Sequence, residues 1–263
     1  MLARWRAAGL IGPSFMTLAM LPVLIGLGTW QLHRKAWKED LIAKIAARVK
    51  AEPVSYTAAL RQYVQTGDVE YLRVQMKGTF DHGNERHLYA PTPSSQGWHI
   101  YSRFLPEGGQ PPIYVNRGWV PDTLKDSGKR IEGQVNGSTT VRGLLRLPER
   151  AGSFKLDNDA KSNRWFVRDA EEMEWNGSPL DKRMGVEQVG KVQHIAPFSL
   201  DAEADPANPG GWPKGGTTEI NIPNRHLEYV LTWYGFALTL IVIFTVFARQ
   251  RLAALNNKSS GET

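Results

Sequence analysis

The chain has two long uncharged stretches, one near each end, with a polar region between them. Residues 7–32 contain no charged side chain, and neither do residues 229–248. An α-helix needs roughly 20 mostly apolar residues to cross a bilayer, and each stretch meets that length. The pattern predicts a two-pass membrane protein. Its parts are transmembrane helices over residues 8–31 and 224–248, an extramembrane domain over residues 32–223, and a tail over residues 249–263.

The predicted extramembrane domain starts with helical periodicity and continues with strands. Apolar residues recur every four positions in residues 34–50, which indicates an amphipathic helix, and residues 56–63 form a short second one. Beyond them, short aromatic and β-branched segments broken by Gly, Pro, Asn and Asp favour a mainly antiparallel, partly barrel-like β domain of α+β type. We expect strands over residues 71–80, 87–90, 98–105, 113–120, 139–147, 164–167, 192–195 and 217–222, and a loop over residues 201–216.

The first apolar stretch is expected to be an uncleaved anchor. It is longer than the 7–15-residue apolar region typical of a signal peptide. It runs into Trp30, and tryptophan is frequent at the membrane–water interface.

Basic residues near the two predicted helices indicate the orientation. The short terminal segments are basic, which places both termini in the cytoplasm, although the opposite flank is basic as well. Long loops are translocated largely regardless of charge, so the termini carry more weight. The large domain is then periplasmic. Because no Arg/Ser-rich targeting segment precedes the anchor, a bacterial inner membrane is favoured. The terminal basic residues are Arg4, Arg6, Arg249, Arg251 and Lys258; those of the opposite flank are Arg34, Lys35 and Lys38.

Composition and motifs exclude several classes of protein. The 263 residues carry a formal net charge of +6 and no cysteine, so a disulfide scaffold and thiolate metal sites are excluded. Much of the basic excess flanks the predicted helices, and no nucleic-acid reader module is recognisable. Hydrolase, metalloprotease, nucleotide-binding and thiol redox motifs are absent, so we expect no enzyme. His82 and His87 flank a turn at a spacing that suits neither a helix face nor a strand face, and a metal site there is not expected.

A histidine stands where the second predicted transmembrane helix begins. Asn224 is a suitable N-cap after Pro223, so the helix is expected to start at Arg225. His226 then shares a face with apolar and aromatic residues, because positions three, four and seven further along a helix lie on one side. Those residues are Tyr229, Val230, Trp233, Tyr234 and Ala237.

Such a face has the chemistry that haem requires. A neutral imidazole ligates iron, flat apolar side chains cover the macrocycle, and cations such as Arg225 can meet the propionates. Trp30 and Trp37 could complete the wall from the first helix. The alternative is an ordinary interfacial belt, with His226 merely solvated. His33, at the mirrored position on the first helix, is the second candidate ligand.

Several segments, in this order on a two-span hairpin, resemble the Surfeit locus protein 1 family of cytochrome oxidase assembly factors, over nearly the whole chain. The residues on which this resemblance rests are the L-G-T-W-Q segment at 27–31 with Arg34, Trp37 and Lys38; Gly97 before W-H-I-Y; N-R-G-W-V-P at 116–121; V-R-G at 141–143 with Pro148 and Glu149; N-R-W-F at 163–166 with Asp169; and Asn224, His226, Tyr229, Thr232 and Trp233.

The resemblance implies a non-catalytic role, in which the protein receives haem a and helps to place it in the large haem-bearing subunit of a haem-copper oxidase. Haem a synthase is a further partner that it suggests. His226 would be the iron ligand, with Trp233, Tyr229, Trp30 and Arg225 around the haem.

Three departures and two alternatives accompany this resemblance. Arg103 stands at a common proline, Val230 at a small residue and Glu228 at an uncharged amide. The first alternative is a haem-free scaffold that binds oxidase subunits, with contacts through Arg117, Trp119 and Trp37. The second is an anchored enzyme whose site lies in the strand region.

Overall fold

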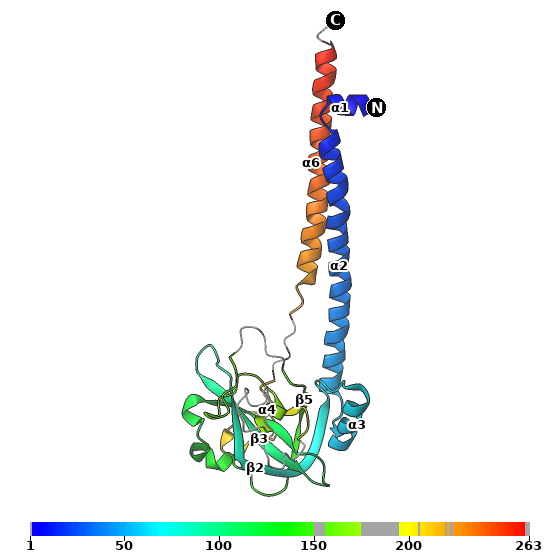
Figure 1. Ribbon diagram of the computed structural model, residues 1–263. Helices are drawn as coiled ribbons and strands as arrows, with labels where there is room; N and C mark the ends of the chain where they lie inside the picture. The colour runs from blue at the N-terminus through cyan, green and yellow to red at the C-terminus, as the bar shows by residue number, and fades with distance from the viewer. Residues whose placement is uncertain are drawn as a thin grey trace, which may run out of the picture. The chain divides into compact units, whose positions relative to one another are not determined.

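The computed structural model describes residues 2–149, 156–174, 195–204, 206–218, 220 and 223–260 (Figure 1). The chain divides into two compact units. Met1–Lys44 and Asn221–Thr263 form the first, here called the helical unit, and Ile45–Ile220 form the second, here called the strand domain.

The helical unit contains α1 (Leu2–Ala7), most of α2 (Ile11–Lys50) and α6 (His226–Ser260). The most apolar 18-residue windows of α2 and α6 have mean hydropathies of 1.7 and 2.1, and only 11% of each window is buried inside the protein. Long apolar helices with so little protein cover match a surrounding bilayer. The structure therefore supports the predicted two-pass membrane protein.

Both long helices start two or three residues after the starts of the predicted spans and extend beyond their C-terminal ends. Between residue 29 and Lys50 there is no glycine or proline to end the helix. The first span and the predicted amphipathic helix are therefore one continuous element, α2. At the other end, α6 continues past residue 248 as far as Ser260 and includes most of the predicted tail.

α2 and α6 lie side by side and antiparallel (Figure 1). They approach closely at Gly28, where an added Cβ would lie 2.6 Å from Cε1 of the Tyr234 ring. The Tyr234 hydroxyl also hydrogen-bonds with Thr29 Oγ1 at 3.1 Å. At the other end of the pair, Leu10 and Ala248 are buried in one apolar cluster. Small residues allow such close approach between membrane helices, and this register brings both termini to one end of the pair.

The strand domain is built on a six-stranded sheet with the order β1-β2-β3-β4-β6-β5. β5 pairs back onto β2, which closes β2, β3, β4, β6 and β5 into a barrel. The β1–β2 and β4–β6 pairs are parallel, and the other pairs are antiparallel. The strands are β1 (Val54–Ser55), β2 (Arg73–Tyr89), β3 (Gly97–Pro106), β4 (Ile113–Pro121), β5 (Thr139–Arg146) and β6 (Ser199–Ala202); the helices are α3 (Tyr56–Thr66), α4 (Ala170–Glu174), η1 (Asp122–Leu124), η2 (Ser127–Gly133) and η3 (Pro209–Gly211).

β4 shows how the alternation of side chains builds two cores. Ile113 and Val115 belong to one buried cluster, whereas Tyr114, between them, belongs to another that includes Trp165. Successive side chains of a strand point to opposite faces, so β4 is covered on both sides. This explains why its sequence is apolar almost throughout, and it confirms the predicted barrel-like β domain.

The N-R-G-W segment of β4 is held by its backbone geometry. Gly118 has φ +126°, and an added Cβ would lie 2.0 Å from the Lys214 carbonyl oxygen. Trp119 and Lys214 exchange two backbone hydrogen bonds of 2.9 and 3.0 Å. Asn116 Oδ1 accepts from the Gly118 amide at 3.1 Å. A glycine is therefore required here by both φ and the neighbouring chain.

Several predicted elements differ from those observed. The predicted strands over residues 71–80 and 87–90 are two parts of one long strand, β2 (Arg73–Tyr89), with a bulge between Asp81 and Arg86. β6 was missed, because its residues 201 and 202 lie at the start of the predicted 201–216 loop. Residues 164–167 form only isolated bridges, and residues 217, 218 and 220 are not in a strand. Most of the predicted 192–195 strand lies outside the described residues. The second helix over residues 56–63 is confirmed as α3.

Candidate functional site

His226 is the first residue of α6, one position after the predicted start at Arg225. Asn224 Oδ1 accepts a hydrogen bond from the backbone amide of His226 at 3.4 Å. The Arg225 carbonyl accepts from the Glu228 amide at 3.2 Å. The first amides of a helix have no partner within it, and Asn224 supplies one, as an N-cap is expected to do.

The His226 ring is held by a residue that was not predicted to be part of the site. Its Nδ1 lies 2.7 Å from Oε1 of Gln31, a side chain on α2 that is only 9% exposed. An amide oxygen can only accept, so Nδ1 is the donor in this contact, and in the neutral ring the free lone pair is then on Nε2. No hydrogen bond to Nε2 is found within the described part of the chain. A half-buried neutral imidazole whose Nδ1 is engaged and whose Nε2 is open is a suitable metal ligand.

The predicted aromatic face divides into two sets. Val230 and Ala237 are buried, and Tyr234 contacts Gly28, so this set faces α2. In contrast, Tyr229 is 53% exposed, and Trp233 is half-buried with its ring edge-on to Phe236. Trp30, next to Gln31 on α2, is 55% exposed. Tyr229, Trp233 and Trp30 therefore leave aromatic surface uncovered at the same end of the helix pair as His226.

The cations near this end have different surroundings. Arg225 is exposed, whereas the Arg34 guanidinium lies over the Trp37 ring, 4.6 Å from its centroid. Lys35 pairs with Glu39 at 2.6 Å. His33, the second candidate ligand, is exposed. Its surroundings thus contrast with those of His226, whose ring is fixed by a buried partner.

The three residues that depart from the family pattern, Val230, Glu228 and Arg103, all fit the surroundings in which they lie. Val230 is buried within the helical unit, and Glu228 is exposed in the first turn of α6. Arg103, on β3, lies 3.3 Å from Glu174 and 4.0 Å from Asp81 and so takes part in an ion-pair cluster of the strand domain.

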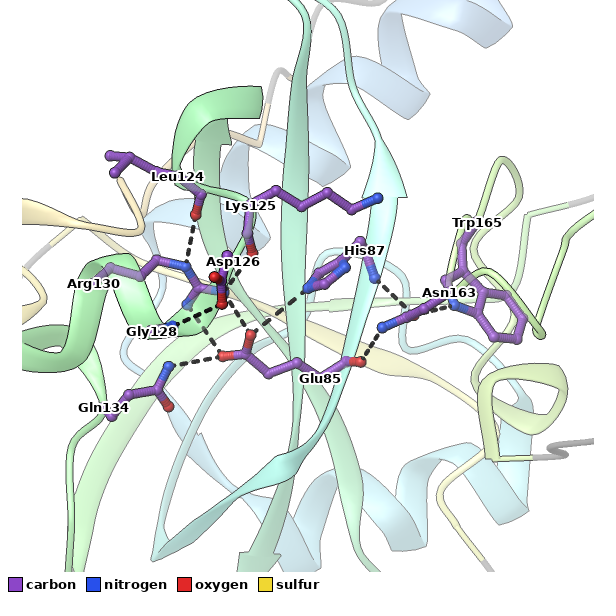
Figure 2. Close-up of polar contacts among 10 residues, drawn as sticks. All are labelled: Glu85, His87, Leu124, Lys125, Asp126, Gly128, Arg130, Gln134, Asn163 and Trp165. Carbon is purple, nitrogen blue, oxygen red and sulfur yellow. Dashed lines mark hydrogen bonds and ion pairs between the residues drawn. The ribbon is translucent and has the colours of Figure 1, made fainter.

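The strand domain contains a buried charged cluster around Glu85 (Figure 2). Its carboxylate accepts two hydrogen bonds from Arg130, at 3.1 and 2.5 Å, and one from Gln134 at 3.2 Å. Burial by itself raises the pKa of Glu85, but the nearby His87 ring, Arg130 and Gln134 outweigh it and lower the pKa to about 2. A carboxylate that stays ionised at neutral pH and is fully engaged is a poor general acid or base. The cluster is a structural ion pair.

The turn that precedes residues 164–167, where a strand was predicted, is tied to the same cluster. Asn163, at φ +49°, donates to the Glu85 carbonyl at 2.8 Å and accepts from the Trp165 indole at 2.9 Å (Figure 2).

The histidine pair of β2, His82 and His87, does not form a metal site with other described residues. The Nε2 atom of His82 lies 2.8 Å from the Val135 carbonyl oxygen. Among the described residues, no group of three or more His, Asp or Glu side chains is placed to hold a metal ion.

Arg117, which the scaffold alternative offers as a contact residue, is 1% exposed. Its Nη2 donates to the Gly133 carbonyl and to Asn208 Oδ1, and the guanidinium lies over the Phe80 ring. Burial lowers the pKa of Arg117 to about 10. The side chain therefore holds the barrel and its flanking loops together and is not available to a partner at the surface.

Comparison with known proteins identifies the relatives of this chain. The model of the SURF1 family matches residues 18–238. Surfeit locus protein 1 of Mus musculus is 32% identical over 250 residues, which is 89% of this chain and 75% of the relative. A SURF1-like protein of Monosiga brevicollis is 33% identical over 253 residues (91% and 89%), and Surfeit locus protein 1 of Homo sapiens is 32% identical over 250 residues (88% and 77%). The chain therefore belongs to the SURF1 family.

Proposed function

We propose that this protein is an assembly factor of cytochrome c oxidase that binds haem a through His226 and helps to place it in the large haem-bearing subunit. The SURF1 family is known as a family of cytochrome c oxidase assembly factors, and membership supports the assembly role. The observation that carries the haem-binding role is the fixed His226 ring, whose Nδ1 is engaged by Gln31.

The residues present fit a haem cargo. His226 would supply the iron ligand through Nε2, which is the nitrogen that the Gln31 contact leaves free. Tyr229, Trp233 and Trp30 present aromatic surface at the membrane boundary, where the long apolar tail of haem a can remain in lipid. Arg225 is an exposed cation beside the ligand, suited to a propionate. One protein ligand also favours release, because the cargo must leave for the oxidase.

The proposal includes an orientation and a mode of action. Arg4, Arg6, Arg249 and Arg251 flank the terminal ends of the helix pair and favour the cytoplasm for that end. The strand domain would then be periplasmic in a bacterial inner membrane. We infer a carrier that acts without turnover, which membership in a family of assembly factors supports.

We expect His226→Ala to lose haem a. The protein is purified in detergent from cells that make haem a, and its reduced absorption spectrum is recorded. Wild-type protein should contain bound haem a, whereas the variant should retain less than about a tenth of it, because an apolar surface without the iron ligand binds the macrocycle weakly.

The matched control is His33→Ala, which removes an exposed histidine close to the same membrane boundary. It should keep the wild-type haem content. Equal haem in His226→Ala and wild type would defeat the assignment. Haem-free wild-type protein that restores oxidase assembly would instead support the scaffold alternative.

A further inference from the structure

The contact between Gln31 and His226 joins residues 195 positions apart in the chain. We propose that Gln31 is a positioning residue for haem binding, which fixes the tautomer and the ring orientation of His226 so that Nε2 is presented to iron. This inference rests on the proposed function.

The geometry favours this role. The separation between Oε1 of Gln31 and Nδ1 of His226 is 2.7 Å, at the short end for a neutral hydrogen bond. Gln31 is 9% exposed on the middle of a continuous helix, so its backbone position is fixed. His226 is at the first turn of α6, where its amide is also held by Asn224. Both the backbone and the ring of the ligand are therefore restrained before any cargo arrives.

The hydrogen bond between Gln31 and His226 is expected to strengthen iron binding by the histidine. A metal-ligating histidine nearly always donates its other N–H to an oxygen acceptor, and that acceptor sets the tautomer and raises the basicity of the ligand. Loss of such an acceptor typically costs 10–100-fold in metal affinity. Gln31 is an acceptor of this kind, supplied by the opposite helix.

A purely structural role for Gln31 has to be separated from a positioning role. An interhelical hydrogen bond also stabilises a membrane helix pair, and a buried amide needs a partner in any case. The chain offers a matched comparison, because Thr29 and Tyr234 form another hydrogen bond between α2 and α6 that does not involve His226. Thr29→Val removes that bond and leaves the imidazole partner in place.

The experiment compares Gln31→Leu, Gln31→Glu and Thr29→Val with wild type in detergent-purified full-length protein. The haem-free protein, labelled with ¹⁵N-histidine, reports the His226 tautomer by NMR. Titration with haem a gives the affinity, and a redox titration of the complex gives the reduction potential.

For Gln31→Leu we expect a 10–100-fold weaker affinity and a shift of His226 away from the Nδ1–H tautomer. Gln31→Glu keeps an acceptor and adds negative charge, so it should retain haem and give a more negative reduction potential. Thr29→Val should match wild type in all three measurements. If Gln31→Leu does not fold, the reduction potential of the haem complex of Gln31→Glu decides between the positioning role and a purely structural role.

The inference is overturned if the Gln31 variants behave like Thr29→Val in tautomer, affinity and potential. That result, together with haem loss in His226→Ala, would leave the proposed function standing. If His226→Ala keeps its haem, the proposed function itself fails, and this inference fails with it.

Discussion

Gly118→Ala is expected to destabilise the strand domain by about 2–6 kcal/mol. At φ +126° the backbone of β4 has a conformation that residues with a side chain rarely adopt, which costs about 1–3 kcal/mol. The new methyl group would also lie 2.0 Å from the Lys214 carbonyl oxygen, so the paired segment must move away. Such overpacking adds about 1–3 kcal/mol. Urea unfolding of the full chain in detergent, followed by near-UV circular dichroism, measures the loss.

Gly137→Ala is the matched control for this prediction. Gly137 also has a positive φ, +81°, but no atom of the described residues lies within 4 Å of the position that its Cβ would take. It should therefore show the conformational cost alone, about 1–3 kcal/mol. If the two variants are destabilised equally, the close packing of Lys214 against β4 contributes nothing to the requirement for glycine at 118.

Arg130→Met is expected to destabilise the strand domain by about 3–5 kcal/mol at pH 7, because it leaves the Glu85 carboxylate buried without its counter-ion. The folded-state pKa of Glu85 is about 2, against an ordinary value of 4.5. A lowered pKa stabilises the fold above the unfolded value, by about 3 kcal/mol for this shift. That contribution is present above pH 4.5 and is lost as the pH falls toward 2. The effect of Arg130→Met should therefore shrink below pH 4.5.

The double variant Glu85→Gln/Arg130→Met isolates the charge. It loses the same hydrogen bonds from Arg130 to the Leu124 and Lys125 carbonyls but leaves no buried charge behind. We expect it to be more stable at pH 7 than Arg130→Met alone. Thermal unfolding at pH 7 and pH 3 compares the variants. An effect of Arg130→Met that is the same at both pH values, or no gain in the double variant, would contradict the role given to this pair.

Much of the fold was predictable because its signals are local. The two spans are visible in the absence of charge over residues 7–32 and 229–248. The helix α2 contains the first stretch from residue 11 onward, and α6 contains the whole of the second. β3 and β4 were predicted within one or two residues, because aromatic and β-branched residues fill them and turn residues bound them.

The missed elements depend on partners that are distant in sequence. β6 is only four residues long, and it forms a strand because β4 and β5 supply partners on both sides. Residues 164–167 have a strand-like composition, yet Trp165 is fixed by a single bridge to Leu88 and by Asn163. Such outcomes follow from tertiary packing, which overrides local preference.

At the candidate site, the sequence indicated His226 but not what holds it. Helical spacing placed Tyr229, Val230 and Trp233 on its face, and it could not show that Val230 is buried while Tyr229 is exposed. Gln31 carries no local signal of its role, since a glutamine near a predicted membrane boundary is unremarkable until the register of α2 against α6 is known.

The most direct test of the central claim is the haem a content of the oxidase itself. In a strain whose own copy of this protein has been deleted, the large oxidase subunit is purified and its haem a is measured after complementation with wild type, His226→Ala or His33→Ala at equal protein levels. We expect wild type and His33→Ala to restore the haem, and His226→Ala to leave it near the level of the deletion strain. Full haem a in the oxidase of the His226→Ala strain would contradict delivery through this histidine.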